Sequence, residues 1–252
     1  MILNQETKIY HYKSLTDLGI INGTTTRNSL NYDDFNLSSK IPDLERKEGC
    51  RSHLSKVVFN KMPIVFPKQT SSDSIWIAGN DKEPVVEADA IITRNKNIAI
   101  GILTADCVPI ILYDIENQAL ALVHAGWRGA AANLVAKTIT LLHNTFNTNP
   151  QNLYATIGPA ISMKNYEVGE EVAQLFMNNN YPNHVITPNE NQKYMLDLWG
   201  ATHFQMTEAG VLEDKIEMAN ICTYDSALFY SARRDGIQTG RFATIAALPY
   251  KT

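Results

Sequence analysis

The sequence predicts an α+β fold in which mixed β-sheets are flanked by helices, layered α/β/β/α, in one domain spanning residues 1–252. A chain of 252 residues is long enough for one large domain with a sizeable core. Short aliphatic runs, typical of buried strands, outnumber the segments with helical spacing, and the two kinds do not alternate strictly. The chain has no internal repeat, low-complexity tract or obvious linker, which favours one continuous domain.

The first hundred residues contain few strong signals. Residues 23–39 are rich in Thr, Asn and Ser and predict a loop, whereas the apolar spacing of residues 47–59 is compatible with a short helix. Residues 74–78 (SIWIA) predict a strand, and a mixed apolar and acidic segment follows at 85–93 (VVEADAIIT).

Strands and helices are clearer in the rest of the chain. Apolar runs predict strands at 97–103, 109–113, 118–123, 153–161, 216–222 and 242–249. Apolar positions at helical spacing predict helices at 129–146, 169–179 and 196–210. Asp197 is the expected N-cap of the last helix, and Gly210 lies just beyond its end.

Charge and composition argue against several classes of protein. The net charge is −4 and no basic block occurs, so nothing suggests nucleic-acid binding. We expect no membrane association, because no apolar run approaches the ~18 residues of a spanning helix and the first residues do not resemble a signal peptide. The three cysteines are few and odd in number, which favours free thiols and a cytoplasmic location.

Two segments carry residue types that perform chemistry. TADCVPIIL (104–112) places Cys107 just after an apolar run, and LVHAGWRGAAANL (122–134) places His124 at the end of another. A strand end gives rigidity and the adjoining loop gives access, so both residues are candidates for a site. A Cys–His pair forms either a nucleophile with its base or part of a soft metal site.

Neighbouring residues support a shaped site around this pair. Asp106 is an acid beside an apolar strand, which requires a partner or a surface position. Gly126 and Gly129 permit tight backbone, and a helix starting at about Gly129 would place Arg128 and backbone N–H groups at an anion-binding N-terminus. A second basic loop, SARRDGIQTGR, supplies three more arginines: Arg233, Arg234 and Arg241.

The chain resembles the YfiH/YlmD-type laccase-domain family, whose members are described as polyphenol oxidases and as purine nucleoside phosphorylases. The matching segments cover nearly the whole chain. In order they are TTR (25–27), FNLS (35–38), EADA (87–90), TADCVPIIL, VHAGWRG (123–129), IGPAI (157–161), YEVGEEV (166–172) and CTYDSALFYSARRDGIQTGR (222–241).

The resemblance also implies a metal site. In this family a zinc ion is held by the His of a Gln-x-His-Gly motif, the Cys of ADC and the His of HAGWRG. The last two correspond to Cys107 and His124, but Ser71 in KQTSSDSIW stands at the position of the first. A serine hydroxyl is a poor zinc ligand beside imidazole or thiolate, so we expect weak or absent zinc. Either a substitute such as His53 or Glu87 completes the site, or this chain has left the zinc chemistry.

For activity, the resemblance implies phosphorolysis of adenosine, inosine or methylthioadenosine, and deamination of adenosine. The implied catalytic residues are Cys107, His124, Arg128 and Asp106. The implied partners are purine nucleoside and phosphate, and the implied binding residues are Arg27, Asn36, Arg233, Arg234 and Arg241. Copper, which the laccase description suggests, is less expected, because multicopper sites need many His ligands and the six here are mostly scattered. The expected assembly is a monomer or a small homo-oligomer.

Two other functions remain open. Cys107 and His124 would serve, without metal, as nucleophile and base of a hydrolase or deamidase, as in the similarly folded necrotizing-factor toxin deamidases. Alternatively, the chain binds a nucleoside with reduced catalysis. Alkylation of the thiol separates the hydrolase from a zinc site, because a zinc-bound thiolate reacts slowly.

Overall fold

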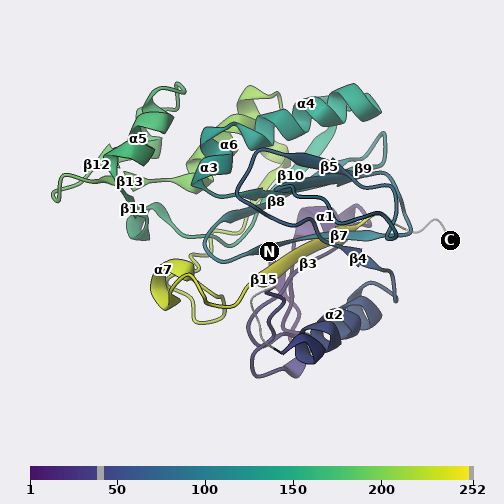
Figure 1. Ribbon diagram of the computed structural model, residues 1–252. Helices are drawn as coiled ribbons and strands as arrows, with labels where there is room; N and C mark the ends of the chain where they lie inside the picture. The colour runs from purple at the N-terminus through teal and green to yellow at the C-terminus, as the bar shows by residue number, and fades with distance from the viewer. Residues whose placement is uncertain (39–42, 250–252) are drawn as a thin grey trace.

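Two six-stranded β-sheets pack against each other, and helices cover the outer face of each (Figure 1). The computed structural model describes residues 1–38 and 43–249. From bottom to top of Figure 1, the layers are helix α2 (Leu44–Val58), the sheet containing β15 (Phe242–Ala247), the sheet containing β8 (Val108–Asp114), and helices α4 (Leu134–Phe146) and α6 (Leu198–Glu208). This arrangement confirms the predicted α+β class and its layering.

Both large sheets mix parallel and antiparallel neighbours. The first has the order β1 (Ile2–Leu3), β2 (Tyr10–His11), β3 (Ile21–Thr24), β15, β7 (Ala99–Thr104), β4 (Ile64–Val65). The second has the order β14 (Ile216–Met218), β10 (Leu153–Ile157), β8, β9 (Ala119–Ala125), β6 (Ala90–Thr93), β5 (Ile75–Ile77). A small third sheet has the order β11 (Glu167–Val168), β13 (Tyr194–Leu196), β12 (Ile186–Pro188).

Shorter elements complete the described part of the chain. The other helices are α1 (Lys13–Asp17), α3 (Trp127–Ala131), α5 (Glu170–Met177) and α7 (Ala232–Asp235). Single 3₁₀ turns lie at Ser29–Asn31, Pro150–Asn152, Met163–Asn165, Asn183–Val185 and Glu213–Lys215. The predicted loop at 23–39 is mostly irregular, and its last residue lies outside the described residues. Each helix in the described ranges is too short or too polar to span a lipid bilayer.

Alternation along β8 explains why the two sheets stack. Ile110 and Leu112 pack in a core shared with the helices above, whereas Ile111 and Tyr113 pack in a second core against the first sheet. All four side chains are buried, so β8 needs apolar residues on both faces. The apolar runs at 97–103, 109–113 and 118–123 therefore predicted real buried strands, β7, β8 and β9.

The single helix predicted over 129–146 is wrong. The structure contains two helices there, α3 and α4, and the first begins at Trp127 rather than at Gly129. The break lies at Asn133, whose φ of 59° is left-handed, a conformation that Asn tolerates better than most residues. The Asn133 side chain also accepts a hydrogen bond from the Tyr181 hydroxyl. The alanines before Asn133 favour a continuous helix, so this tertiary contact could not be predicted from the sequence.

The other helix predictions are close to the structure. The helix expected over 47–59 starts earlier, because Asp43 accepts a hydrogen bond from the Arg46 backbone and caps α2. Asp197 caps α6 as predicted, by accepting from the Gly200 backbone. Gly210 follows α6 with a φ of +95°.

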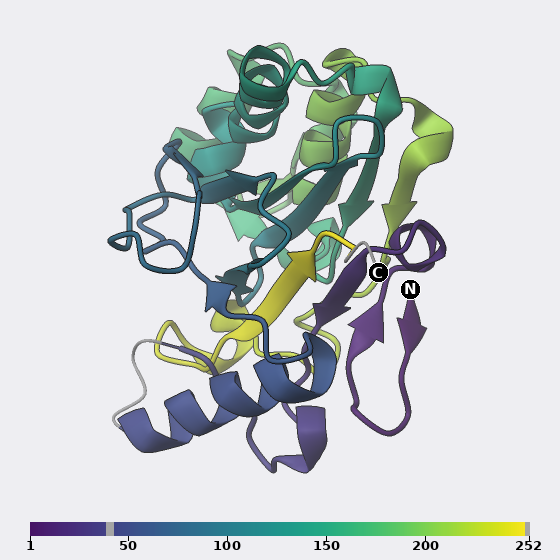
Figure 2. The same cartoon turned by 90° about the vertical axis from the view of Figure 1, so that its right-hand side faces the viewer.

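The chain crosses from one sheet to the other directly before β8. Strand β7 belongs to the first sheet and β8 to the second, and only three residues, Ala105, Asp106 and Cys107, join them. Asp106 has a φ of 84°, which turns the backbone sharply within this short link. Figure 2 shows the edge of the two sheets, with α2 lying below the first sheet.

Close packing between the sheets predicts the effect of a methyl group at Gly158. A Cβ atom there would lie 2.4 Å from the Tyr12 hydroxyl and 2.6 Å from the Pro109 ring. Gly158→Ala should lower the free energy of unfolding by about 1–3 kcal/mol, measured by urea denaturation. Gly49→Ala is the control, because no atom of the described residues lies within 4 Å of a Cβ at this exposed position of α2 and Ala favours helix. Equal stability of the wild type and G158A would contradict the packing argument.

Candidate functional site

A cavity of about 580 Å³ contains the predicted Cys–His pair, and its volume is within the range of small-molecule sites. Its wall is made by several separate segments. The described lining consists of Leu37, Ser38, Lys47, Arg51, Phe66, Pro67, Lys68, Gln69, Ser71, Val85, Leu103, Ala105, Cys107, His124, Ile237 and Arg241.

Strand pairing brings Cys107 close to the end of β9. Val108 pairs with Ala125 and Pro109 pairs with His124, so the residue before Val108 lies beside the residue after Ala125. That residue is Gly126, and a Cβ atom on it would lie 3.0 Å from the Cys107 sulfur. The thiol thus packs against bare backbone, and glycine is required for this close approach.

Asp106 shapes the loop rather than lining the cavity. Its carboxylate is 7% exposed and accepts hydrogen bonds from the Thr223 hydroxyl at 2.6 Å and from the Arg233 backbone N–H at 2.7 Å. The partner that an acid beside an apolar strand requires is therefore supplied by the segment 223–233. Asp106 positions Cys107 by fixing the link between the two sheets.

His124 is held by a carboxylate that the sequence analysis did not single out. Its Nδ1 lies 2.8 Å from Oδ1 of Asp89, and its backbone N–H donates to the Asp89 carbonyl. Asp89 is fully buried, and its other oxygen accepts from the backbone N–H groups of Thr70 and Ser72 and from the Ser72 hydroxyl. The available signal was an acid inside the apolar segment VVEADAIIT, because a buried carboxylate must be paired.

This arrangement keeps the imidazole protonated. Burial lowers the pKa of His124, but the negative charge of Cys107, hydrogen bonds to Asp89 and Cys107, and the charge of Asp89 raise it to about 10. Burial raises the pKa of Asp89, but the His124 hydrogen bond and the Ser72 donors outweigh it and leave the pKa below its ordinary value. With Nδ1 bound to Asp89, Nε2 is left for Cys107. The pair is an imidazolium beside the sulfur of Cys107, oriented by a carboxylate.

The loop that carries Ser71 is tied to the edge of β7. Gln69 donates to the Leu103 carbonyl and accepts from the Leu103 N–H, each at 2.8 Å, in the manner of a strand neighbour. Ser71 follows in left-handed backbone, with a φ of 59°, and lines the same cavity as Cys107 and His124. The position that resembles the family's zinc-binding His thus shares the cavity with the other two expected ligands.

Within residues 1–38 and 43–249, no third metal ligand joins Cys107 and His124. Among the described residues, no group of three or more His, Cys, Asp or Glu side chains is arranged to hold a metal ion. The two conceivable substitutes are engaged elsewhere. His53 lies 5.8 Å from the Tyr32 ring, and Glu87 forms an exposed ion pair with Lys68.

Arg241 is the one arginine of the predicted set that lines the cavity. Its guanidinium donates to the carbonyls of Thr239 and Gly240, at 2.6 and 2.9 Å, and of Ile237. Burial lowers the pKa of Arg241, and the nearby negative charges of Cys107 and Asp106 oppose that shift. Asn36 does not line the cavity, but its side-chain oxygen accepts from the Arg241 backbone N–H at 3.0 Å and so positions this residue.

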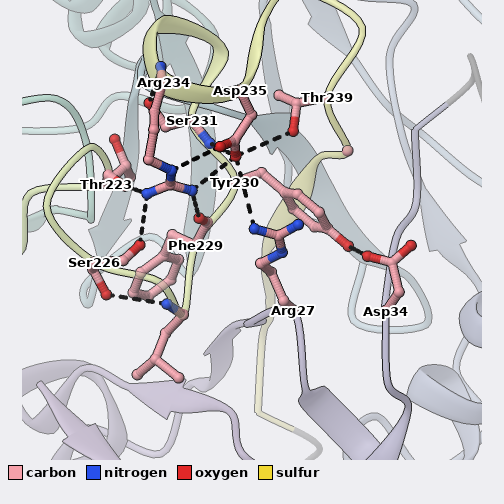
Figure 3. Close-up of polar contacts among 12 residues, drawn as sticks. Arg27, Asp34, Thr223, Ser226, Phe229, Tyr230, Ser231, Arg234, Asp235 and Thr239 are labelled. Atoms are coloured by element: carbon pink, nitrogen blue, oxygen red, sulfur yellow. Dashed lines mark hydrogen bonds and ion pairs between the residues drawn. The ribbon is translucent and has the colours of Figure 1, made fainter.

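Arg27 and Arg234 bind other parts of the protein (Figure 3). The Arg234 guanidinium donates to Asp235 and to four backbone carbonyls, those of Thr223, Tyr224, Ser226 and Phe229. The Arg27 guanidinium lies 4.7 Å from the centre of the Tyr230 ring and 3.7 Å from Asp235. Both side chains therefore organise the segment 223–239.

The remaining predicted arginines also lie outside the cavity lining. The Arg233 guanidinium donates to the Glu167 carbonyl and lies 5.1 Å from the centre of the Tyr166 ring. Arg128 is exposed and stacks 4.1 Å from the Trp127 ring centre. Of the predicted residues, the structure thus gathers Cys107, His124, Ser71 and Arg241 in one cavity and places the others around it.

Comparisons with known proteins show the family of this chain. The family model described as multi-copper polyphenol oxidoreductase laccase matches residues 22–249. A protein of Bacteroides thetaiotaomicron named purine nucleoside phosphorylase is 34% identical over 95% of this chain and 96% of its own length. A protein from an unknown prokaryotic organism, named adenosine deaminase RL5, is 33% identical over 72% of this chain and 73% of its own.

Comparison with solved structures agrees with the fold described above. The crystal structure of Bacillus licheniformis hypothetical protein YfiH superposes with a TM-score of 0.89 at 23% identity, covering 98% of each chain. At that identity the likeness establishes the shared fold. The named relatives are enzymes, and this chain is an enzyme by the same family membership.

The contacts of Arg234 predict that its replacement lowers stability. Such a loss is expected of an arginine with a structural role and not of one that binds a ligand. Arg234→Lys removes the guanidinium that donates hydrogen bonds to four backbone carbonyls, so the free energy of unfolding should fall by about 2 kcal/mol. Arg94→Lys is the control, because Arg94 is exposed and, among the described residues, contacts the Phe146 ring alone, so its effect should stay within about 0.5 kcal/mol. Urea denaturation measures both. An R234K variant as stable as the wild type would remove the structural assignment.

The Asp89–His124 pair predicts a pH-dependent loss of stability. A His whose pKa is raised on folding stabilises the folded state below its ordinary value of 6.5, and this contribution is lost as pH rises through about 10. Asp89→Asn removes part of that rise, so its destabilisation should be larger at pH 6.5 than at pH 10.5. Urea denaturation at the two pH values gives the comparison.

Asp73→Asn is the matched control for this experiment. Asp73 forms a half-exposed ion pair with Lys137, so its loss should change stability little at either pH. A destabilisation by D89N that is equal at both pH values would show that Asp89 does not act through the charge of His124.

Proposed function

Because the chain belongs to the multi-copper polyphenol oxidoreductase laccase family, we propose that it is a purine nucleoside phosphorylase acting on adenosine, inosine or methylthioadenosine. The observation that carries the proposal is the cavity around Cys107 and His124. Its described lining contains no carboxylate and four cationic side chains besides the imidazole, from Lys47, Arg51, Lys68 and Arg241. Such a lining favours an anionic ligand such as phosphate.

The residues supply two parts of the phosphorolysis reaction. A phosphate oxygen forms a bond to C1′ of the nucleoside as the C1′–N bond breaks, and the departing base takes up a proton. Arg241 offsets the charge of phosphate in the cavity. His124 is protonated at neutral pH, donates the proton to the base and recovers one from the phosphate ester. Asp89 stabilises the imidazolium that this role requires.

Adenosine deamination is a second proposed activity. It appears in the name of one relative. The reaction adds water to C6 of the purine and releases ammonia, so it requires an activated water beside the base. We propose it as the weaker activity, because the residue that would complete a water-activating metal site is Ser71.

Zinc is the metal implied by the resemblance, and the residues present do not form a three-ligand site for it. Cys107 and His124 suit zinc, but Ser71 does not, and no other described residue completes the set. Two protein ligands leave the other positions to exchangeable water, so we propose weak or absent zinc occupancy. Copper fits less well, because the six His residues do not gather.

One observation favours a different function. Asp89, His124 and Cys107 form an acid–imidazole–thiol series without a third metal ligand, as in enzymes that use a cysteine nucleophile. In that case the chain is a metal-independent hydrolase or deamidase. A third outcome is a nucleoside-binding protein with reduced catalysis, which binds ligand without turnover.

The proposed partners are a purine nucleoside and phosphate, with no role for nucleic acid or a membrane. A cytoplasmic location is proposed from the three cysteines, which are all free. A monomer or small homo-oligomer is the proposed assembly.

Phosphate-dependent release of hypoxanthine from inosine tests the main proposal. The wild type should release base only when phosphate is present, and Cys107→Ala and His124→Gln should each lower the rate by at least about 100-fold. Rapid alkylation of Cys107 together with hydrolysis of amide substrates, without phosphorolysis, would favour the hydrolase. Calorimetric binding of inosine with no turnover would favour the binding protein.

Ser71→His should raise zinc retention. The left-handed backbone at residue 71 accepts His more readily than most residues, and the imidazole would join Cys107 and His124 in one cavity. Zinc content after dialysis should rise from well below one ion per chain towards one, and phosphorolysis should rise with it. Full zinc occupancy in the wild type would refute the weak-site proposal. Higher zinc without higher turnover would show that this chain has abandoned the zinc chemistry.

A further inference from the structure

Helix α2 contributes two cations to the cavity that no motif includes. Lys47 and Arg51 are four residues apart on α2 and therefore lie on the same helix face. Figure 2 shows this helix along the lower side of the molecule, separated in sequence from the segments that carry Cys107 and His124. The two side chains close the cavity from a different layer of the fold.

Neither of these two cations forms an ion pair with a carboxylate of the described residues. Within the described residues, no carboxylate lies within 4 Å of the Lys47 ammonium or of the Arg51 guanidinium, whereas Lys68 is paired with Glu87. Like charges one helical turn apart repel each other, so the folded protein bears a cost for this pair. A bound anion would remove that cost.

Arg51 is also held in a fixed orientation. Its guanidinium donates to the Ile64 carbonyl and lies 5.3 Å from the centre of the Phe66 ring. A guanidinium fixed in this way loses little conformational freedom when it binds a phosphoryl group. Lys47 adds a mobile point charge one turn away.

Arg51 lies where the cavity adjoins a second one. This neighbouring cavity, of about 370 Å³, is also lined by Glu48, Asp81 and Glu83, none of which forms an ion pair with Arg51, and neither Cys107, His124 nor Arg241 contributes to it. Apart from Lys68, which is paired with Glu87, the cationic groups of the lining come from two parts of the fold: His124 and Arg241 from strand ends, and Lys47 and Arg51 from α2. A single orthophosphate at the first part leaves the second without a ligand.

We propose that Lys47 and Arg51 form a second anion subsite, which binds the phosphoryl group of a purine nucleoside 5′-monophosphate. The inference rests on the proposed function for the identity of the nucleoside. Its physical basis is the charge and placement of the α2 side chains. A phosphomonoester dianion matches two adjacent cations better than the neutral 5′-hydroxyl of a nucleoside does.

Isothermal titration calorimetry with AMP, adenosine and inorganic phosphate tests the subsite. In the wild type at low salt, AMP should bind at least about tenfold more tightly than adenosine, and the ratio should fall as salt is raised. Lys47→Ala should lower the ratio to less than about threefold, and Lys47→Arg should restore it. Lys56→Ala is the matched control, because Lys56 is exposed on α2 and does not line the cavity.

Several results would overturn the inference. Equal affinities for AMP and adenosine in the wild type would remove the subsite. Phosphate binding that is itself weakened by Lys47→Ala would assign the α2 cations to the free phosphate instead. Preferential binding of AMP without any phosphorolysis would leave the subsite standing and remove the proposed function, so the two failures are distinguishable.

Discussion

The carboxylate of Asp89 joins three parts of the chain at the cavity. One oxygen binds His124 at the end of β9, and the other binds the loop that carries Ser71, through Thr70 and Ser72. Asp89 itself precedes β6, so a single buried charge fixes the relative positions of a strand end, a loop and a strand start. Removing a charged group from water is costly unless every lone pair is used, and here both oxygens are engaged.

Asp106 plays a corresponding part on the other side of the thiol. Its two oxygens bind Thr223 and the Arg233 backbone, which ties the link between the sheets to the segment before β15. Two buried carboxylates therefore position Cys107. Asp89 acts through His124, and Asp106 acts through the backbone of the link between the sheets. The anionic groups are turned into the protein, and the cations Arg241, Lys47 and Arg51 face the cavity. This division of charge explains how a chain with a net charge of −4 presents a cationic site.

Much of this could be predicted from the sequence, and the exceptions have a common physical cause. Cys107 and His124 were found because each follows a run of aliphatic residues, and such runs depend only on local pattern. Asp89 and the break at Asn133 depend on contacts between segments far apart in the chain. The structural roles of Arg234 and Arg27 could not be predicted for the same reason. The sequence of a basic loop is the same whether its guanidiniums bind a ligand or contact other parts of the protein. The role of Lys47 and Arg51 on α2 could not be predicted from the sequence, since charged residues on a helix usually face solvent.

The position of β15 has a consequence for how the protein is made. This strand lies between β3 and β7 and pairs with both, yet it is synthesised after every other strand of the first sheet. Arg241 immediately precedes it. On the ribosome, β3 and β7 can pair with β2 and β4, but the strand that joins these two halves of the sheet comes from the far end of the chain, and long-range pairing of this kind slows folding. Arg241, which lines the cavity with Cys107, is made together with that last strand, so an incomplete nascent chain lacks a finished cavity.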